Sequence, residues 1–326
     1  MEEAERPRVL PAMPGSSGKP LLRGLTRPFG RFSRWLDNRS ELTTAYLYLA
    51  PTLLLLLCTV VFPIGYSLFL SFTKMEFAGG AIHYSFVGLD NYLGMLKDPR
   101  VGKIVSNTVS FTFLKVVLTL LLAFGIALIV YLGVWGAGFF KRLFLIPWAL
   151  SNVVNSLMWK WMYSGDNGIV NELLTRAGWL EKYRMWLIEP QSAMGAVLFA
   201  DIWKSTPYVA LMLLAAMQSI PKDLHESAKM DGAGAFVTFS HIIFPLIKPV
   251  LMITLIIETM WTLRVFDIIW ILTEGGPQDS TMILNTYAYE QAFRHFEFGY
   301  AAAISYIITL ITVILTVVYM KALDEH

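Results

Sequence analysis

Charged residues are scarce in this chain of 326 residues: 15% are Asp, Glu, Lys or Arg, against 56% hydrophobic residues, and the mean hydropathy is +0.55. An average soluble domain carries about 25% charged residues. Charge is absent altogether from residues 42–73, 116–140, 143–159, 205–221 and 298–320. Runs of this length match the roughly 20 apolar residues that cross a bilayer. The composition excludes a soluble enzyme, a disordered protein and a nucleic-acid binder.

Cysteine is almost absent too. The single cysteine, Cys58, lies in an apolar run, which excludes an intrachain disulfide and a thiolate metal cluster. The five histidines are scattered without the spacing of metal ligands. The first 40 residues are polar and rich in Arg, Pro and Gly, unlike a cleavable signal peptide. We therefore expect residues 1–44 to be a basic cytoplasmic tail attracted to anionic membrane lipid, and the first apolar segment to act as an uncleaved insertion signal.

The apolar runs predict an all-α integral membrane protein. Six transmembrane helices are expected at about residues 45–72, 104–132, 142–163, 193–217, 249–272 and 299–320. Helices are favoured because a lipid-exposed backbone must satisfy its own hydrogen bonds, and the sequence lacks the ten-residue alternation of a barrel. Pro51, Pro63 and Pro147 predict local kinks in these helices.

The distribution of Lys and Arg predicts the topology. With the N-terminus inside, fourteen of these residues fall on the cytoplasmic side and eight on the outer side. Because cytoplasmic segments carry the excess of positive charge, both termini are expected inside. Residues 73–103 then form an outer loop, 104–320 the core with a cytoplasmic loop at 218–248, and 321–326 a cytoplasmic end.

The loop at 218–248 has the pattern of two short helices. Ser219 is a candidate cap for the first, and Pro221 falls in its first turn. Leu224 and Ala228 share one face of this helix. Two short helices of this kind form a knob that fits a groove on another protein, although a re-entrant linker is an alternative.

Glycines separate the two short helices. Gly232 and Gly234 interrupt the pattern, since each glycine disfavours a helix by about 1 kcal/mol. The second helix is expected to end at Pro245. The residues that form a recognisable pattern here are Glu226-Ser-Ala228, Gly232, Ile242 and Phe244-Pro245.

This pattern closely resembles the "EAA" loop of ATP-binding-cassette importer permeases, which is the coupling helix that docks on the ATPase subunit. The family form usually has Glu-Ala-Ala and Leu-Pro, so Ser227 and Phe244 are small departures. The flanking segments resemble the carbohydrate branch, and within it the maltose-type permease subunit. These segments are Met230-Asp-Gly-Ala-Gly234 and Pro245-Leu-Ile-Lys-Pro249.

Further segments resemble the same sugar permeases, namely Phe86–Tyr92, Gly168–Asn171 and Leu272–Pro277. The resemblance thus covers roughly residues 45–320. It implies that spans two to six form the type I importer permease core, with the first span packed beside it.

The resemblance also implies the partners. A second permease completes a heterodimer, two ATPase subunits bind the 222–245 loop, and an extracytoplasmic binding protein delivers the sugar, in the bacterial inner membrane. Since the sequence lacks a Walker motif, we expect no enzyme activity, catalytic residue, metal or cofactor on this chain, with ATP and Mg on the ATPase subunits. The residues implied in coupling are Glu226, Ser227, Ala228, Asp231, Gly232, Ala233, Gly234 and Pro245.

Charged residues also occur at membrane depth: Asp201 and Lys204 in the fourth predicted span, and Glu258, Arg264 and Asp267 in the fifth. Each such charge costs about 2.5–3.5 kcal/mol on insertion scales, so it needs a partner or a cavity. Asp201 and Lys204 are three residues apart, and so are Arg264 and Asp267. Internal ion pairs are therefore an alternative to ligand binding. Lys115 and Lys160 lie nearer the ends of their spans, where the side chain can extend to the interface.

A substrate pathway is expected in the core. Glu258, Trp261, Thr262 and Val265 share one helical face, and the resemblance assigns that face to the sugar site. Sugars also favour aromatic, amide and charged groups, so the remaining candidates are Asn152, Asn155, Trp159, Trp161, Trp203, Lys204, Tyr208, Arg264 and Asp267. The tryptophans have the alternative of an interfacial aromatic belt, and the asparagines that of interhelical contacts. Whether the sugar is anionic stays open, because internal pairing would neutralise the two cations.

An ion-coupled secondary carrier is the alternative function, with the three acids at membrane depth as proton relays. Carriers commonly contain inverted repeats, and none is evident in this sequence. A membrane scaffold without transport would leave the buried ionic groups unexplained.

Overall fold

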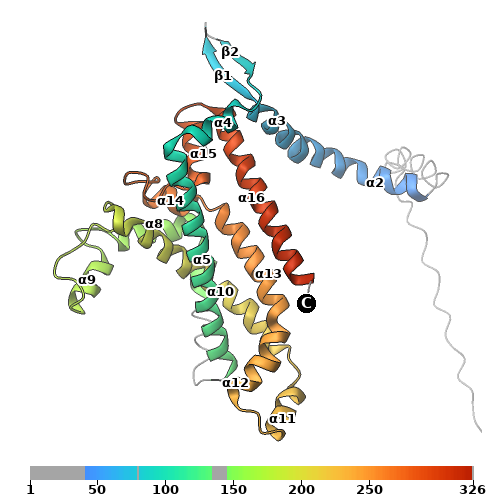
Figure 1. Cartoon of the computed structure of the whole chain (residues 1–326), viewed down its shortest axis with the longest axis vertical. Helices are drawn as coiled ribbons and strands as arrows, with labels where there is room; N and C mark the ends of the chain where they lie inside the picture. The colour runs from blue at the N-terminus through green and yellow to red at the C-terminus, as the bar shows by residue number, and fades with distance from the viewer. Residues whose placement is uncertain (1–40, 79–80, 134–144, 325–326) are drawn as a thin grey trace, which may run out of the picture. The chain divides into compact units, whose positions relative to one another are not determined.

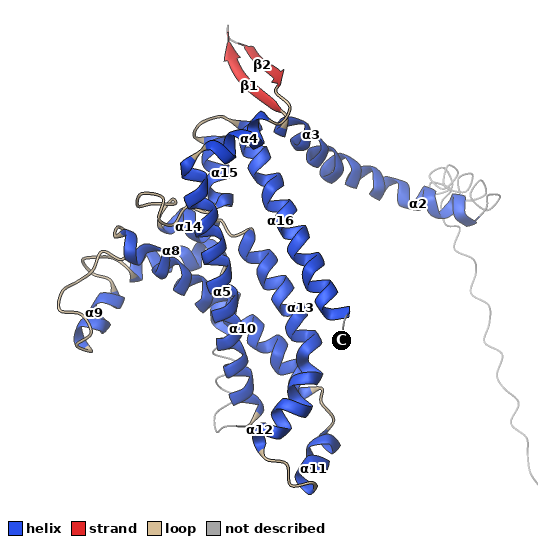
Figure 2. Cartoon of the chain, viewed as in Figure 1, coloured by secondary structure: helices blue, strands red, loops and turns tan. Residues whose placement is uncertain are grey.

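The computed structural model describes residues 41–78, 81–133 and 145–324, and these residues are helical apart from a two-stranded hairpin and loops (Figure 2). The π-helical turns are labelled η. The elements are α2 (Glu41–Leu56), η2 (Leu57–Val61), α3 (Phe62–Ser71), β1 (Thr73–Ala78), β2 (Ala81–Phe86), α4 (Asp90–Lys97), α5 (Pro99–Tyr131), α7 (Leu145–Ala149), α8 (Asn152–Met162), α9 (Ile169–Arg176), α10 (Pro190–Gln218), α11 (Lys222–Met230), α12 (Ala235–Thr238), η3 (Phe239–Ile243), α13 (Phe244–Leu263), α14 (Asp267–Leu272), α15 (Leu284–Phe293) and α16 (Phe298–Asp324).

The chain divides into two compact units, Met1–Ile64 and Gly65–His326. Most of the predicted basic tail lies outside the described residues, so the first unit is represented by α2, η2 and the start of α3. The apolar helix Ala45–Ser71 has none of its most hydrophobic stretch buried. With 27 residues, this helix is long enough to cross a bilayer.

Five helices are long and apolar enough to cross a membrane: Ala45–Ser71, Pro99–Tyr131, Pro190–Gln218, Ala235–Leu263 and Phe298–Ala322. They correspond to five of the six predicted spans. The third prediction, a continuous helix over 142–163, is wrong for its described part, which forms α7 and α8. Ser151 ends the continuity because its Oγ accepts a hydrogen bond from the N–H of Val154 at 3.3 Å and starts α8 as an N-cap.

The fifth span differs from its prediction at both ends. It begins at Ala235. The second short helix, which was expected to end at Pro245, instead continues through η3 and Pro245 into α13. The wide turn of η3 accommodates the missing N–H of this proline. At the other end the helix stops at Leu263, and α14 starts only at Asp267.

Asn285 stabilises this break between α13 and α14. Its side-chain nitrogen donates to the carbonyl oxygens of Arg264 and Val265, at 3.1 and 3.2 Å. Carbonyls at membrane depth need such a partner once the helix no longer supplies one. The predicted helical face that includes Val265 is therefore wrong, since Val265 lies beyond the helix.

Residues 73–103 contain an antiparallel hairpin, in which Thr73 of β1 pairs with Phe86 of β2, followed by α4 and the start of α5. Asp98 caps α5: its carboxylate accepts the N–H of Arg100 at 2.9 Å, and Pro99 occupies the first helical position. Within the second unit, Figure 1 shows α11 and α12 at the end opposite this hairpin.

The second unit has its core where α5 and α10 pack along each other and where α8, α13, α14 and α15 pack against them, with α16 packed on α13 and α15. Small residues such as Ala123, Ala127 and Ala200 are buried at these contacts and let the helix backbones approach closely. This packing brings polar residues from several helices to one depth.

Candidate functional site

Lys115 forms a buried ion-pair triad with acids of two other helices. Its Nζ lies 2.9 Å from Oδ2 of Asp201 on α10 and 3.2 Å from Oε1 of Glu258 on α13. The side chains of Lys115 and Glu258 are only 4% and 1% exposed. Charges that are buried in this way require each other, so the triad ties α5, α10 and α13 together. The expectation that Lys115 extends to the interface is wrong, because it lies midway along α5.

A cavity of about 550 Å³ lies beside the triad, a size typical of small-molecule sites. Its walls come from α5, α7, α8, α10, α13, α14 and the break between the last two. The lining residues are Lys115, Trp148, Asn152, Asn155, Asp201, Lys204, Ser205, Tyr208, Trp261, Arg264, Val265, Phe266, Asp267 and Ile268.

Three aromatic side chains form a row along one wall of the cavity. The rings of Trp148 and Tyr208 are stacked, with centroids 5.5 Å apart and an angle of 19°. The rings of Tyr208 and Trp261 lie 5.2 Å apart at 44°. Trp148 and Trp261 remain 45% and 46% exposed, so part of each side chain is accessible to a ligand. A row of this kind offers a flat apolar surface, which suits the apolar face of a pyranose.

The two asparagines of α8 differ in their contacts. The side-chain nitrogen of Asn152 donates to Oδ2 of Asp267 at 3.0 Å. Asn155 is 1% exposed, and within the described residues neither its amide nitrogen nor its amide oxygen has a hydrogen-bond partner. An unsatisfied buried polar group costs about 1–3 kcal/mol. Asn155 therefore presents one donor group and one acceptor to the cavity that it lines.

The internal ion pairs considered from the sequence are not formed. Asp201 is paired with Lys115 rather than with Lys204. The break after Leu263 separates Arg264 from Asp267, and Nε of Arg264 donates instead to the carbonyl of Met260 at 3.3 Å. In the part of the chain that the structure describes, neither Lys204 nor Arg264 has a carboxylate within 4.0 Å.

Most of the predicted pathway residues line the cavity, namely Asn152, Asn155, Lys204, Tyr208, Trp261, Arg264, Val265 and Asp267. Five do not. Glu258 lies behind Lys115, and Thr262 donates its hydroxyl to the Glu258 carbonyl at 2.7 Å. Trp159 is buried against Trp203, with ring centroids 5.6 Å apart, in the core between α8 and α10. Trp161 is 81% exposed on the surface.

The second feature is the knob formed by residues 222–245. α11 ends at Met230, and Gly232 turns the chain with φ +74°, a conformation that favours glycine. Gly234 is the N-cap of α12 with φ −72°. Ser219 does not cap α11 as expected; it is the C-cap of α10, and its hydroxyl donates to the Ala216 carbonyl.

The predicted coupling residues are mostly exposed on this knob: Glu226, Ser227, Asp231, Gly232, Gly234 and Pro245 are exposed, Ala233 is half-buried and Ala228 is buried. The knob is attached to α5 through Tyr131, whose hydroxyl lies 2.5 Å from Nε2 of His225 on α11. Beyond the knob, Ile247 is fully buried in the helical core. The knob thus has an exposed surface and is held to the helical core by these contacts.

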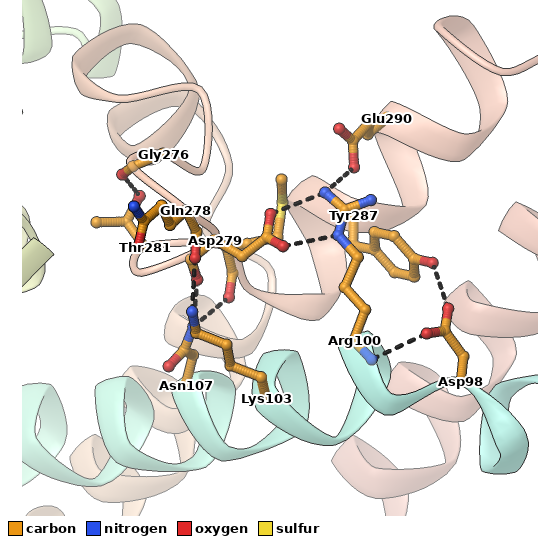
Figure 3. A network of polar contacts seen from close by, with 11 residues as sticks. Asp98, Arg100, Lys103, Asn107, Gly276, Gln278, Asp279, Thr281, Tyr287 and Glu290 are labelled. Atoms are coloured by element: carbon orange, nitrogen blue, oxygen red, sulfur yellow. Dashed lines mark hydrogen bonds and ion pairs between the residues drawn. The ribbon is translucent and has the colours of Figure 1, made fainter.

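A polar network braces the start of α5 against the loop after α14 (Figure 3). Arg100 binds both Asp279 and Glu290, with nitrogen–oxygen distances of 2.8 and 2.9 Å. The hydrogen bond from Arg100 holds the pKa of the Asp279 carboxyl below its usual value. Asn107, one of the residues drawn in Figure 3, donates to the carbonyls of Asp279 and Met282. The network fixes the loop that leads from α14 to α15.

Residues 116–324, which include the knob and every lining residue of the cavity except Lys115, match the family described as "Binding-protein-dependent transport system inner membrane component". The chain belongs to this family. It is a multi-pass membrane permease, as its apolar helices require.

Two curated relatives match this permease over most of both chains. The sulfoquinovosyl glycerol transport system permease SmoG of Agrobacterium fabrum is 34% identical over 291 residues, 89% of this chain and 93% of the relative. The trehalose/maltose transport system permease MalF of Thermococcus litoralis is 36% identical over 282 residues, 86% and 94% of the two chains.

A solved structure shows the same fold. A chain in the crystal structure of a bacterial ABC transporter that imports the acidic polysaccharide alginate aligns with this permease at a TM-score of 0.74 and 22% identity. The alignment covers 91% of this chain and 98% of that chain. The expectation of a type I importer permease fold is confirmed, although the third span is divided.

Several lining residues of the permease cavity are not among the residues predicted from the sequence, namely Lys115, Trp148, Ser205, Phe266 and Ile268. Asp201 is predicted as a charge at membrane depth but not as a pathway residue. One signal was available for Lys115. Three acids were assigned to membrane depth against two bases, so one further buried base was needed. No comparable signal marks Trp148, whose place depends on how α7 packs against α10.

Proposed function

We propose that this permease is one of the two membrane subunits of an ATP-driven, binding-protein-dependent sugar importer. The observation that carries the proposal is that one chain combines an aromatic-walled polar cavity among its membrane helices with an exposed knob of the ATPase-coupling pattern. Two relatives, the permeases of the sulfoquinovosyl glycerol and trehalose/maltose transport systems, support sugar as the substrate class.

The cavity accounts for the chemistry of sugar binding. The row of Trp148, Tyr208 and Trp261 takes the apolar face of a pyranose ring. Asn155 donates to one hydroxyl and accepts from a neighbouring one, which satisfies both of its orphan atoms. The second permease closes the open side of the cavity, where Trp261 remains half exposed.

The knob couples the permease to the ATPase subunits, which supply the energy for transport. The ATPase subunits hold ATP and Mg, and α11 docks on one of them through its exposed residues around Glu226. When the ATPase dimer closes, α11 moves, and the Tyr131–His225 contact carries this movement into α5. Lys115 then moves α10 and α13 with α5, because the triad joins them. The cavity walls thus rearrange as rigid bodies, without covalent chemistry on this chain.

The orientation follows from the charge distribution, with both termini and the knob in the cytoplasm of the bacterial cell and the hairpin outside. The segments assigned to the cytoplasm contain fourteen Lys and Arg and those assigned to the outside contain eight, which supports this topology.

An ion-coupled carrier is less well supported, because Asp201 and Glu258 are both held by Lys115 and are not free to relay protons.

The experiment that tests the proposed function is to purify the tagged permease and to measure uptake in cells. We expect an ATPase and a second permease to co-purify, and uptake to survive an uncoupler but stop on ATP depletion. Uptake abolished by the uncoupler at constant ATP would contradict the importer. The Glu226→Lys variant should insert normally yet lose uptake.

A further inference from the structure

The cavity contains two cations without ionic partners. Its lining residues include three cationic side chains, and one of these, Lys115, is neutralised by the carboxylates of the triad. Lys204 and Arg264 face no carboxylate within 4.0 Å in the described part of the chain. A charge at membrane depth that lacks a partner within the protein is expected to meet one in the cavity.

The carboxylates near the cavity do not satisfy this requirement. Asp201 is engaged by Lys115, and Asp267 accepts a hydrogen bond from Asn152. Glu258 lies behind Lys115 and does not line the cavity. Together with Glu258, the three carboxylates equal the three cations in number, but in the described part of the chain none of them lies within 4.0 Å of Lys204 or Arg264.

Arg264 is placed for recognition of an oxyanion. A guanidinium has five N–H donors, and within the described residues Arg264 uses only Nε, toward the Met260 carbonyl. Its backbone is fixed by the hydrogen bond from Asn285 to its carbonyl. A planar group with free parallel donors on a fixed backbone binds carboxylate, sulfonate or phosphate oxygens in a bidentate way.

We propose that the sugar carried by this permease bears an acidic group, which Arg264 binds with Lys204 alongside while the aromatic row holds the sugar ring. This inference rests on the proposed function and adds the substrate class to it. Neutral parents of the same sugar leave the two cations unpaired and are poor substrates.

The test uses the complete complex with its binding protein in proteoliposomes that contain ATP. The probes are matched pairs: glucuronate-containing disaccharides with their neutral glucose parents, and a 6-sulfonated glucoside with its parent. We expect uptake of an acidic member and not of its neutral parent. Arg264→Gln should raise the KM for the acidic sugar about tenfold to a hundredfold. Arg264→Lys should raise it less, since it keeps the charge but loses the fork.

Controls separate this role from folding. Arg294→Gln changes an arginine that does not line the cavity and should leave the KM unchanged. If Arg264→Gln assembles poorly, Lys204→Gln is used in its place and should also raise the KM for the acidic sugar. ATP-dependent uptake of neutral sugars with an unchanged KM in both cavity variants would overturn the acidic substrate and leave the importer intact. Absence of any ATP-dependent uptake and of an associated ATPase would instead overturn the proposed function.

Discussion

The cavity and the knob are built in opposite ways. The knob takes its residues from one continuous stretch, 222–245, and its shape depends on local features such as the positive φ of Gly232. The cavity takes its residues from positions as far apart as Lys115 and Ile268, and it forms only when six helices pack together. A local motif tolerates changes elsewhere in the fold, whereas a packed cavity depends on every helix around it.

The two regions also handle charge differently. The knob leaves Glu226 and Asp231 exposed, where charge costs little and is available to a partner protein. The cavity buries Lys115 among carboxylates, where an ion pair is costly to break. We expect that changes in the triad act first on stability, and that changes in the knob act on assembly with the ATPase.

The largest effect is expected from Lys115→Met. This change leaves Asp201 and Glu258 buried without their cation and should destabilise the permease by about 3–5 kcal/mol. Thermal unfolding in detergent and the amount of inserted protein measure the loss. The triple variant with Asp201→Asn and Glu258→Gln removes all three charges and should recover most of the stability. A single variant as stable as the native protein would show that the triad does not hold the helices together.

The knob is tested by a pair of glycines. Proline fixes φ near −65°, so Gly232→Pro cannot adopt φ +74° and should abolish co-purification of the ATPase while insertion is normal. Gly232→Ala should weaken the fold of the knob by about 1–2 kcal/mol. Gly234→Ala is the matched control, because Gly234 has φ −72° and an added Cβ meets no atom within 4 Å. Equal behaviour of the Gly232 and Gly234 variants would contradict the role of the turn.

A smaller effect is expected from the aromatic row. Trp148→Ala removes one stacked ring from the cavity wall and should raise the KM for uptake about two- to tenfold. Trp161→Ala removes a tryptophan that was also predicted from the sequence to bind the sugar but is 81% exposed and outside the cavity. It should leave the KM unchanged, and a larger effect from Trp161 than from Trp148 would place the sugar elsewhere.

The smallest effect concerns the brace between Arg100 and Asp279. The pKa of the Asp279 carboxyl is lowered in the folded state, so the brace stabilises above the unfolded value of 3.8 and is lost as pH falls through the lower folded value. Asp279→Asn should therefore lower the melting temperature at about pH 7, and the difference from the native protein should shrink on acidification toward about pH 3. A constant difference across this range would exclude the ionised carboxylate as its cause.

Two regions illustrate how far prediction from the sequence reaches. The positions of Gly232 and Gly234 were sufficient to predict the turn of the knob, because backbone conformation at a glycine is decided by its immediate neighbours. The fifth span could not be bounded in the same way. Its end at Leu263 depends on Asn285, which lies on α15 and binds the freed carbonyls only after the helices have packed.

The sequence by itself determined the membrane class, five of the spans and the coupling pattern, because apolar run length and glycine position act locally. Only the tertiary structure decided which charges pair. It brought Lys115 to Asp201 and Glu258, and left Arg264 and Lys204 facing the cavity. The physical reason is that an ion pair between helices depends on the rotation and depth of each helix, and these are set by packing against all the others.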